Sequence, residues 1–193
     1  MIHDDRVLRA GFVPQEVEHR DAEVTHLSSV LRPLTDGEPA DTALVTGPSG
    51  AGKTCISQFV TERLREEALD IEATYINCWR NHTRFRTLYQ LLDDIGKTID
   101  IHRQSTPHDE LIDRLQQYDG NRTVVILDEA DQLEDTSVIY DLHSLPQFAV
   151  ICITNNEEDL FGRVDDRLVS RLRASERVRM DEYADEQLVD ILA

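Results

Sequence analysis

The chain has 193 residues, which suffice for one domain or for one domain and part of a second. No stretch approaches about eighteen consecutive apolar residues, and the start does not read as a secretory signal, so we expect a soluble, cytoplasmic protein without a membrane span. Its 38 acidic and 20 basic residues give a formal net charge of −18, and this balance excludes binding of duplex DNA through bulk electrostatic attraction.

Lysine is nearly eliminated from the basic residues, because only Lys53 and Lys97 are present. An excess of carboxylates with so little lysine favours a protein that stays soluble in concentrated salt, where charge repulsion is screened over a few ångströms. We therefore expect a halophilic source, and an acidic domain from a non-halophile is the alternative. The three cysteines have no C-x-x-C spacing, so neither a disulfide framework nor a zinc site is expected.

In chain order, apolar periodicity predicts a helix over 17–31 and a turn-rich connector over 34–41. Strands and helices then alternate. The predicted strands cover 43–46, 72–77, 123–128, 148–154 and 176–180, and the predicted helices cover 53–69, 83–98, 108–117, 137–142 and 165–172. This alternation predicts an α/β fold in which a five-stranded parallel sheet carries helices on both faces and binds its ligand at the carboxyl ends of the strands.

The last residues, 185–193, begin another amphipathic helix of about two turns, a length that is marginal unless the helix docks. Two interpretations stay open. The segment is either the first piece of a following domain or a self-contained helix packed on the sheet.

Residues 47–54 match the pattern G-x-x-x-x-G-K-[ST], in which glycines let the backbone wrap a phosphate and aim N–H groups at it. An apolar strand before the loop and a helix after it supply the context that the motif requires. The sequence therefore predicts a P-loop nucleotide site. The predicted contacts are Gly47, Pro48, Ser49, Gly50, Ala51, Gly52, Lys53, Thr54 and Cys55.

Within this loop, Lys53 would reach the outer phosphates and the Thr54 hydroxyl would bind Mg²⁺. A second segment, 123–131, is an apolar run that ends in two adjacent acids. Asp128 can hold the water shell of the metal, and Glu129 can polarise an attacking water. Acids that end strands also serve as helix caps, but their pairing with the loop favours the nucleotide role.

Asn155 follows the strand predicted beside that of Asp128, where a polar side chain can orient the attacking water near the γ-phosphate. Arg167, or Arg171 as second choice, can act as an arginine finger on a neighbouring protomer. In isolation these residues would be interpreted as a turn asparagine and as arginines in surface ion pairs.

The densest basic segment is 79–86, in which arginines alternate with aromatic residues. Arg80, Arg84 and Arg86 could contact a DNA backbone or minor groove. The segment can equally be a solvated helix face, packed underneath by Phe85 and the leucines that follow it.

The chain resembles the AAA+ ATPases and, among them, the archaeal origin-recognition-type replication initiators. The resemblance is carried by segments 12–20, 75–84, 127–131, 153–156 and 183–192, of which the first two discriminate best. It implies an AAA+ domain over 1–183 with an adenine-side segment over 1–41, and the first helix of an incomplete lid over 184–193. The family's winged-helix domain is not expected within these residues.

The resemblance also implies the residue roles. Val13 and Arg20 would belong to the adenine pocket, Asn155 would sense the γ-phosphate, and Arg167 matches the finger position. The implied cofactors are ATP or ADP with Mg²⁺, and hydrolysis would be slow. The implied partners are double-stranded DNA at replication origins, the replicative helicase and other initiator protomers. Two alternatives remain open, namely a non-hydrolysing nucleotide-bound scaffold and another DNA-associated AAA+ protein such as a clamp loader.

Overall fold

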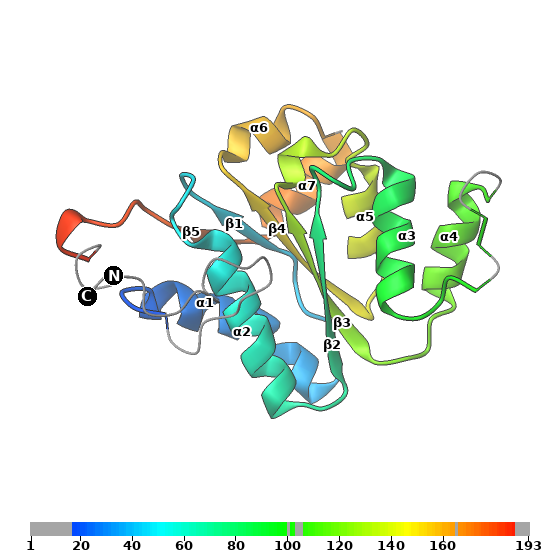
Figure 1. Cartoon of the computed structure of the whole chain (residues 1–193), viewed down its shortest axis with the longest axis horizontal. Coiled ribbons are helices and arrows are strands. Elements are labelled where there is room, and N and C mark those ends of the chain that lie inside the picture. The colour runs from blue at the N-terminus through cyan, green and yellow to red at the C-terminus, as the bar shows by residue number, and fades with distance from the viewer. Residues whose placement is uncertain (1–16, 100, 103–105, 165, 188–193) are drawn as a thin grey trace.

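A computed structural model of the chain describes residues 17–99, 101–102, 106–164 and 166–187 (Figure 1). A five-stranded parallel sheet lies at its centre, with the strand order β2-β3-β4-β1-β5. The strands are β1 (Ala43–Thr46), β2 (Ile71–Asn77), β3 (Arg122–Asp128), β4 (Phe148–Thr154) and β5 (Glu176–Arg179). The predicted five-stranded parallel sheet is thereby confirmed.

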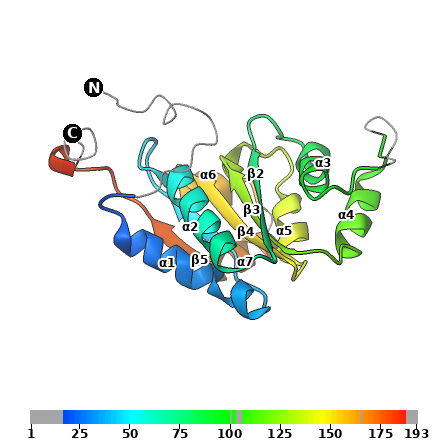
Figure 2. The ribbon, with the colours of Figure 1, turned by 60° about the horizontal axis from the view of Figure 1, so that its bottom comes forward.

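Helices cover both faces of the sheet, as predicted. On one face α1 and α2 lie side by side, whereas α3, α4 and α5 cover the other face (Figures 1 and 2). The helices are α1 (Asp21–Leu31), α2 (Lys53–Glu67), α3 (Arg84–Asp94), α4 (His108–Gln116), α5 (Ser137–His143), α6 (Glu157–Phe161) and α7 (Asp166–Ala174). Two short 3₁₀ turns are Arg32–Asp36 and Ala130–Gln132.

The central strands are the most deeply buried. All residues of β4 are buried, and in β3 only the first residue is partly exposed, because helices cover both faces of these strands. Alternate residues enter two apolar clusters. In β3, Val124 and Ile126 pack toward α1 and α2, whereas Val125 and Leu127 pack toward α3 and α5. The core therefore holds β3 rigidly between its two layers.

The register brings the functional residues to one edge of the sheet. Thr46 pairs with Thr154, and Asn77 pairs with Asp128, so these strands end at the same edge. The loop after β1, the acids after β3 and the asparagines after β4 consequently emerge together. This is the carboxyl edge at which the alternating pattern predicts a ligand.

Two predicted helices were too long. The first begins at Asp21 rather than at residue 17, because His19 adopts φ 60°, in the left-handed region, and interrupts the helical backbone. α3 ends at Asp94 rather than at residue 98, because Gly96 adopts φ 70° and the Lys97 N–H donates to the Leu92 carbonyl at 2.7 Å. This is a Schellman-type helix end. The other predicted boundaries agree within two residues.

One helix was not predicted. α6 begins directly after Asn156, whose side-chain oxygen accepts from the Glu158 N–H at 3.0 Å, and three acids in the first turn complement the helix dipole. At the end of the chain, residues 185–187 are helical, and 188–193 of the predicted tail helix lie outside the described residues. None of the described helices is long and apolar enough to cross a membrane.

Candidate nucleotide-binding site

The predicted phosphate-binding loop connects β1 to α2. It contains three glycines with positive φ, and Gly52 at φ 90° directly precedes the helix. A Cβ atom at Gly47 would lie 2.2 Å from the carbonyl oxygen of Met180, and one at Gly52 would lie 3.2 Å from the Tyr183 hydroxyl. The loop is therefore packed against the segment that follows β5, and its backbone can pass there only without side chains.

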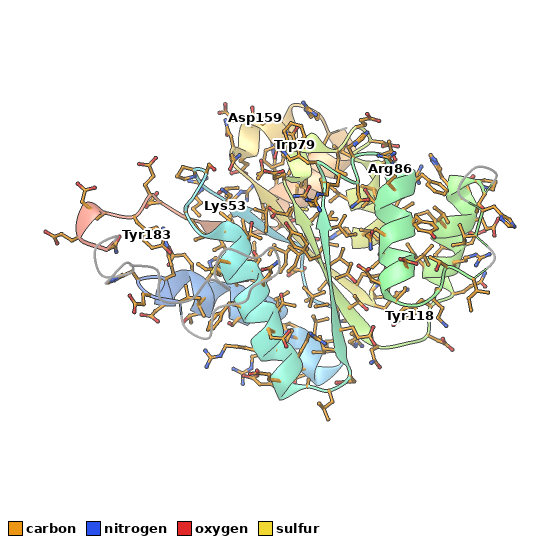
Figure 3. The ribbon with its side chains drawn as sticks, in the orientation of Figure 1. Lys53, Trp79, Arg86, Tyr118, Asp159 and Tyr183 are labelled. Atoms are coloured by element: carbon orange, nitrogen blue, oxygen red, sulfur yellow. The ribbon has the colours of Figure 1, made fainter. Side chains whose placement is uncertain are left out.

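Lys53 is the first residue of α2, and its ammonium group turns back over the loop (Figure 3). Its Nζ donates to the carbonyls of Gly47 and Pro48, both at 2.8 Å, and to Asn155 Oδ1 at 2.9 Å. The residue is only 8% exposed. Burial lowers the pKa of Lys53, and nearby carboxylates oppose that effect. This contact brings together the loop lysine and Asn155, which were both predicted to be site residues.

Thr54 and Asp128 are joined by a hydrogen bond. The Thr54 hydroxyl donates to Asp128 Oδ2 at 2.9 Å, although 74 positions separate the two residues in the chain. Tyr75 donates its hydroxyl to the same carboxylate oxygen at 2.7 Å. Burial, and then this hydrogen bond, raises the pKa of Tyr75 to about 12, so the phenol stays a donor. Asp128 itself is 7% exposed at the tip of β3.

Glu129 adopts a backbone conformation that is rare for a residue with a side chain. Its φ is 57° and its ψ is 48°, in the left-handed region. Such strain is retained where the surroundings enforce it, and it is common at functional sites. Burial raises the pKa of the Glu129 carboxyl, and the adjacent charges of Asp128 and Asp131 raise it further. A raised pKa suits a carboxylate that takes a proton from water.

The tip of β4 is fixed by its own contacts. The Thr154 hydroxyl donates to Asp131 Oδ1 at 3.0 Å, which links the end of β4 to the turn after β3. Asn155 then follows, exposed except for its contact with Lys53. The structure thus places Asn155 beside the phosphate-binding loop.

These residues enclose a pocket of about 300 Å³. Its lining residues come from the loop, the start of α2 and the tips of β3 and β4. They are Ser49, Gly50, Gly52, Lys53, Thr54, Cys55, Asp128, Glu129, Ile153, Thr154 and Asn155. Gly47 and Pro48 contribute through carbonyls that hold Lys53, and Ala51 is buried beneath the loop.

The donor set fits Mg²⁺ in combination with phosphate. Among the described residues there is no group of three or more His, Cys, Asp or Glu side chains that could hold a metal by themselves. Mg²⁺ is usually held by one or two protein oxygens together with phosphates and waters. Thr54 and Asp128 supply hard oxygen atoms of this kind at the mouth of the phosphate-binding loop.

Arg20 lies at the start of α1, where it joins the N-terminal part of the structure to the segment after β5. Its guanidinium lies 4.1 Å from the centroid of the Tyr183 ring and donates to the Asp181 carbonyl and to Glu23. Because Tyr183 also approaches Gly52, Arg20 supports the back of the loop without lining the pocket. Val13, the other predicted adenine contact, lies outside the described residues.

The two candidate finger residues lie on α7, whose backbone is described from Asp166 to Ala174. The side chains of Arg167 and Arg171 lie outside the described part of the structure. Their role as a finger stays a prediction.

The basic segment at 79–86 connects β2 to α3, toward the same end of the sheet as Lys53 (Figure 3). Trp79 is 62% exposed, and Arg80 and Arg86 are exposed beside it. Arg84 differs, because its guanidinium is paired with Asp141 of α5 at 2.7 Å. The surface available to a partner is therefore Trp79, Arg80 and Arg86, whereas Arg84 joins α3 to α5.

Sequence reasoning missed two contributors to the site. Tyr75 lies inside a strand whose sequence is typical of the hydrophobic core, and nothing near it distinguishes this tyrosine from a packing residue. Asp131 could have been noticed, because a third acid follows the pair at 128–129 within one turn. Its partner Thr154 lies on another strand and becomes evident only from the sheet register.

Comparison with known proteins agrees with this geometry. A family model described as an AAA domain matches residues 37–173. ORC1-type DNA replication protein 9 of Halobacterium salinarum is 83% identical over 193 residues, and ORC1-type DNA replication protein 1 of the same organism is 58% identical over 192 residues. Both alignments cover the whole of this chain. The chain spans 54% and 62% of the length of these relatives, respectively.

Among solved structures, the ORC1 protein of Aeropyrum pernix in complex with DNA is 27% identical, with a TM-score of 0.77. The alignment covers 96% of this chain and 51% of that one. The two Halobacterium relatives also agree with the halophilic source expected from the acid-rich composition. The chain therefore belongs to the AAA domain family, and within that family its resemblance is to the ORC1-type DNA replication proteins.

Proposed function

We propose that this chain is the ATP-binding and ATP-hydrolysing module of a DNA replication initiator. The observation that carries the proposal is the hydrogen-bonded convergence of Lys53, Thr54, Asp128 and Asn155 at one pocket. These side chains come from the first turn of α2, the end of β3 and the residue that follows β4, and packing alone gives no reason for them to meet. The match to an AAA domain supports the same conclusion.

Each residue has a defined part in this proposal. The backbone N–H groups of the loop and Lys53 bind the phosphates, and the start of α2 adds the positive end of its dipole. Bound Mg²⁺ would neutralise charge on the phosphates, and Thr54 and Asp128 would hold it. Glu129 orients and deprotonates the attacking water, and Asn155 contacts the γ-phosphate. Arg167, with Arg171 as second choice, acts on the nucleotide of a neighbouring protomer.

Replacement of the loop lysine tests the phosphate contact. Lys53→Ala should weaken ADP binding at least about 100-fold, because the loop keeps its backbone donors but loses its only full positive charge. Lys97→Ala is a matched control, since Lys97 lies 5.8 Å from the Tyr118 ring and contributes nothing to the pocket. Calorimetric titration of ADP into both variants measures the difference. Unchanged affinity in Lys53→Ala would exclude the proposed site.

A scaffold that binds nucleotide without hydrolysis is the second candidate, because the proposed finger arginine would act only on the nucleotide of a neighbouring protomer. A single chain would then hold nucleotide without the group that completes the hydrolytic site. Glu129→Gln separates the two functions. Steady-state phosphate release that disappears in this variant while ADP binding persists supports the enzyme, and absence of turnover by the parent chain at every salt concentration supports the scaffold.

We further propose that duplex DNA is a partner, contacted through Trp79, Arg80 and Arg86. Two exposed cations beside an exposed indole suit a phosphate backbone or a groove wall. The solved DNA complex of the Aeropyrum pernix relative supports DNA as the ligand class. The net charge of −18 opposes DNA binding everywhere else, so we expect weak affinity from this chain alone. Other initiator protomers and a replicative helicase complete the proposed partners.

A further inference from the structure

Tyr75 occupies a position on β2 from which its side chain reaches the nucleotide site. β2 is one of the two edge strands of the sheet, and Tyr75 pairs with Ile126 of β3. Asn77 pairs with Asp128 in the same register, so Tyr75 lies on the same face as Asp128, one side-chain repeat earlier along the strands. That is the face covered by α2, which carries Thr54.

The tyrosine hydroxyl and the threonine hydroxyl converge on a single atom. Asp128 Oδ2 accepts from Tyr75 at 2.7 Å and from Thr54 at 2.9 Å. A carboxylate held by two donors on one oxygen has a fixed rotamer and a fixed plane. Packing does not need the phenolic oxygen, because the side chain is 40% exposed at the edge of the sheet and a phenylalanine ring would fill the same position.

We propose that Tyr75 is a positioning residue for Mg²⁺, which acts by holding the Asp128 carboxylate in the orientation that shares the metal with Thr54. The inference rests on the proposed function, because it presumes that Asp128 serves a Mg²⁺–nucleotide complex. Groups that hydrogen-bond to metal-binding side chains orient them, and their loss weakens metal affinity about 10- to 100-fold. Tyr75 contacts the carboxylate and does not line the phosphate pocket, so its effect should be confined to the metal.

The test compares ADP binding with Mg²⁺ and with EDTA, by calorimetric titration. The parent chain should bind ADP more tightly when Mg²⁺ is present. In Tyr75→Phe the increase in ADP affinity caused by Mg²⁺ should be about tenfold smaller than in the parent chain. The ADP affinity of this variant in EDTA should equal that of the parent. Tyr118→Phe is the matched control, because Tyr118 stacks on Phe148 at the opposite end of the sheet (Figure 3). It should leave both affinities unchanged.

A second pair of variants tests whether Tyr75 acts through the Asp128 carboxylate. If Tyr75 acts through the carboxylate, Tyr75→Phe should have no additional effect on the Mg²⁺-dependent gain in an Asp128→Asn background. Thermal unfolding of each variant, without nucleotide, reports whether the fold is preserved.

The possible failures are distinguishable. A parent chain whose ADP affinity is the same with Mg²⁺ and with EDTA overturns the proposed metal site and this inference with it. A normal gain in Tyr75→Phe overturns this inference alone, and so does an enhanced gain, which would mean that the phenol competes with the metal. An equal loss of affinity in both conditions, together with earlier unfolding, also overturns it, because Tyr75 would then support the fold.

Discussion

At the residue scale, the phosphate-binding loop contains two glycines that are required for different reasons. Gly47 has φ 150°, and a Cβ atom there would lie 2.2 Å from the Met180 carbonyl oxygen. Gly50 has φ 82°, and a Cβ atom there would meet no atom within 4 Å. At position 47 a close backbone contact therefore leaves no room for a side chain. At position 50 there is room, and only the backbone conformation favours glycine.

Alanine at these positions should separate the two requirements. We expect Gly47→Ala to lower the free energy of unfolding by about 3 kcal/mol, because an unfavourable backbone conformation and overpacking act together. Gly50→Ala should cost about 1 kcal/mol, from the backbone conformation alone. Urea titrations of the two variants, followed by circular dichroism, measure the difference. Equal losses would mean that the contact with Met180 does not constrain the loop.

The sequence predicted those site residues whose relation is local, and the structure added those that depend on register. Lys53 and Thr54 follow from eight consecutive residues, and Asp128 follows from an apolar run that ends in acids. Tyr75 and Asp128 are 53 positions apart in the chain. Their side chains meet because β2 and β3 pair in a register that puts Asn77 opposite Asp128. One residue of slip would turn the phenol to the other face, and no local pattern specifies that register.

At the element scale, α3 is attached to the core by its apolar face and to α5 by one ion pair. Leu88 and Leu92 are fully buried, and Arg84 contacts Asp141 through two nitrogens, at 2.9 and 2.7 Å. Burial raises the pKa of Asp141 above its usual range, although Arg84 acts to lower it. The carboxylate is thus poorly solvated and depends on the arginine for compensation.

Arg84 and Arg86 should therefore differ in a paired experiment. Arg84→Ala should lower the free energy of unfolding by about 1.5 kcal/mol, because it leaves a half-buried carboxylate without its cation. Arg86→Ala, on the exposed side, should change stability by less than about 0.5 kcal/mol. Binding of a fluorescent duplex should show the opposite order, with a loss in Arg86→Ala and a smaller one in Arg84→Ala. A similar loss of DNA affinity in both variants, at equal stability, would contradict this division of roles.

Errors in the predicted elements arose where one residue stopped or started a helix against the apolar periodicity. The periodicity extended the third helix beyond Gly96, but the left-handed conformation of this glycine ends α3. The periodicity gave Asn156 no structural role, whereas its side chain caps α6. Both signals are present in the sequence. Their effect depends on backbone angles that periodicity does not report.

At the scale of the whole molecule, alternation of strands and helices predicted a parallel sheet but not the order of its strands. Right-handed crossovers limit the possible arrangements without selecting one. In the structure β1 lies between β4 and β5, so the phosphate-binding loop is next to the tip that carries Asn155. The order β2-β3-β4-β1-β5 thus explains why residues 53 and 155 make contact.

The net charge of −18 also acts on the molecule as a whole. At about 0.1 M salt the screening length is about 10 Å, so carboxylates on neighbouring elements repel one another, whereas at about 1 M it falls to about 3 Å. Some ion pairs in the described part of the chain are exposed, and pairs of that kind contribute little stability that salt could remove. Salt screens the partly buried pairs, such as Arg84 with Asp141, much less. Reduced repulsion should therefore outweigh the loss of attraction, and added salt should stabilise the fold.

The urea midpoint should accordingly rise between about 0.1 M and about 2 M KCl, and urea is the suitable denaturant because it adds no ions of its own.

A variant can connect this effect of salt to repulsion between carboxylates. Glu66 and Glu67 are exposed in the last turn of α2, where two like charges also face the negative end of the helix dipole. The double substitution Glu66→Gln and Glu67→Gln should raise the midpoint in low salt and leave it unchanged in high salt, because screening already removes the same repulsion there. An equal increase at both salt concentrations would assign the gain to helix propensity, and a midpoint of the parent chain that did not depend on salt would contradict adaptation to concentrated salt.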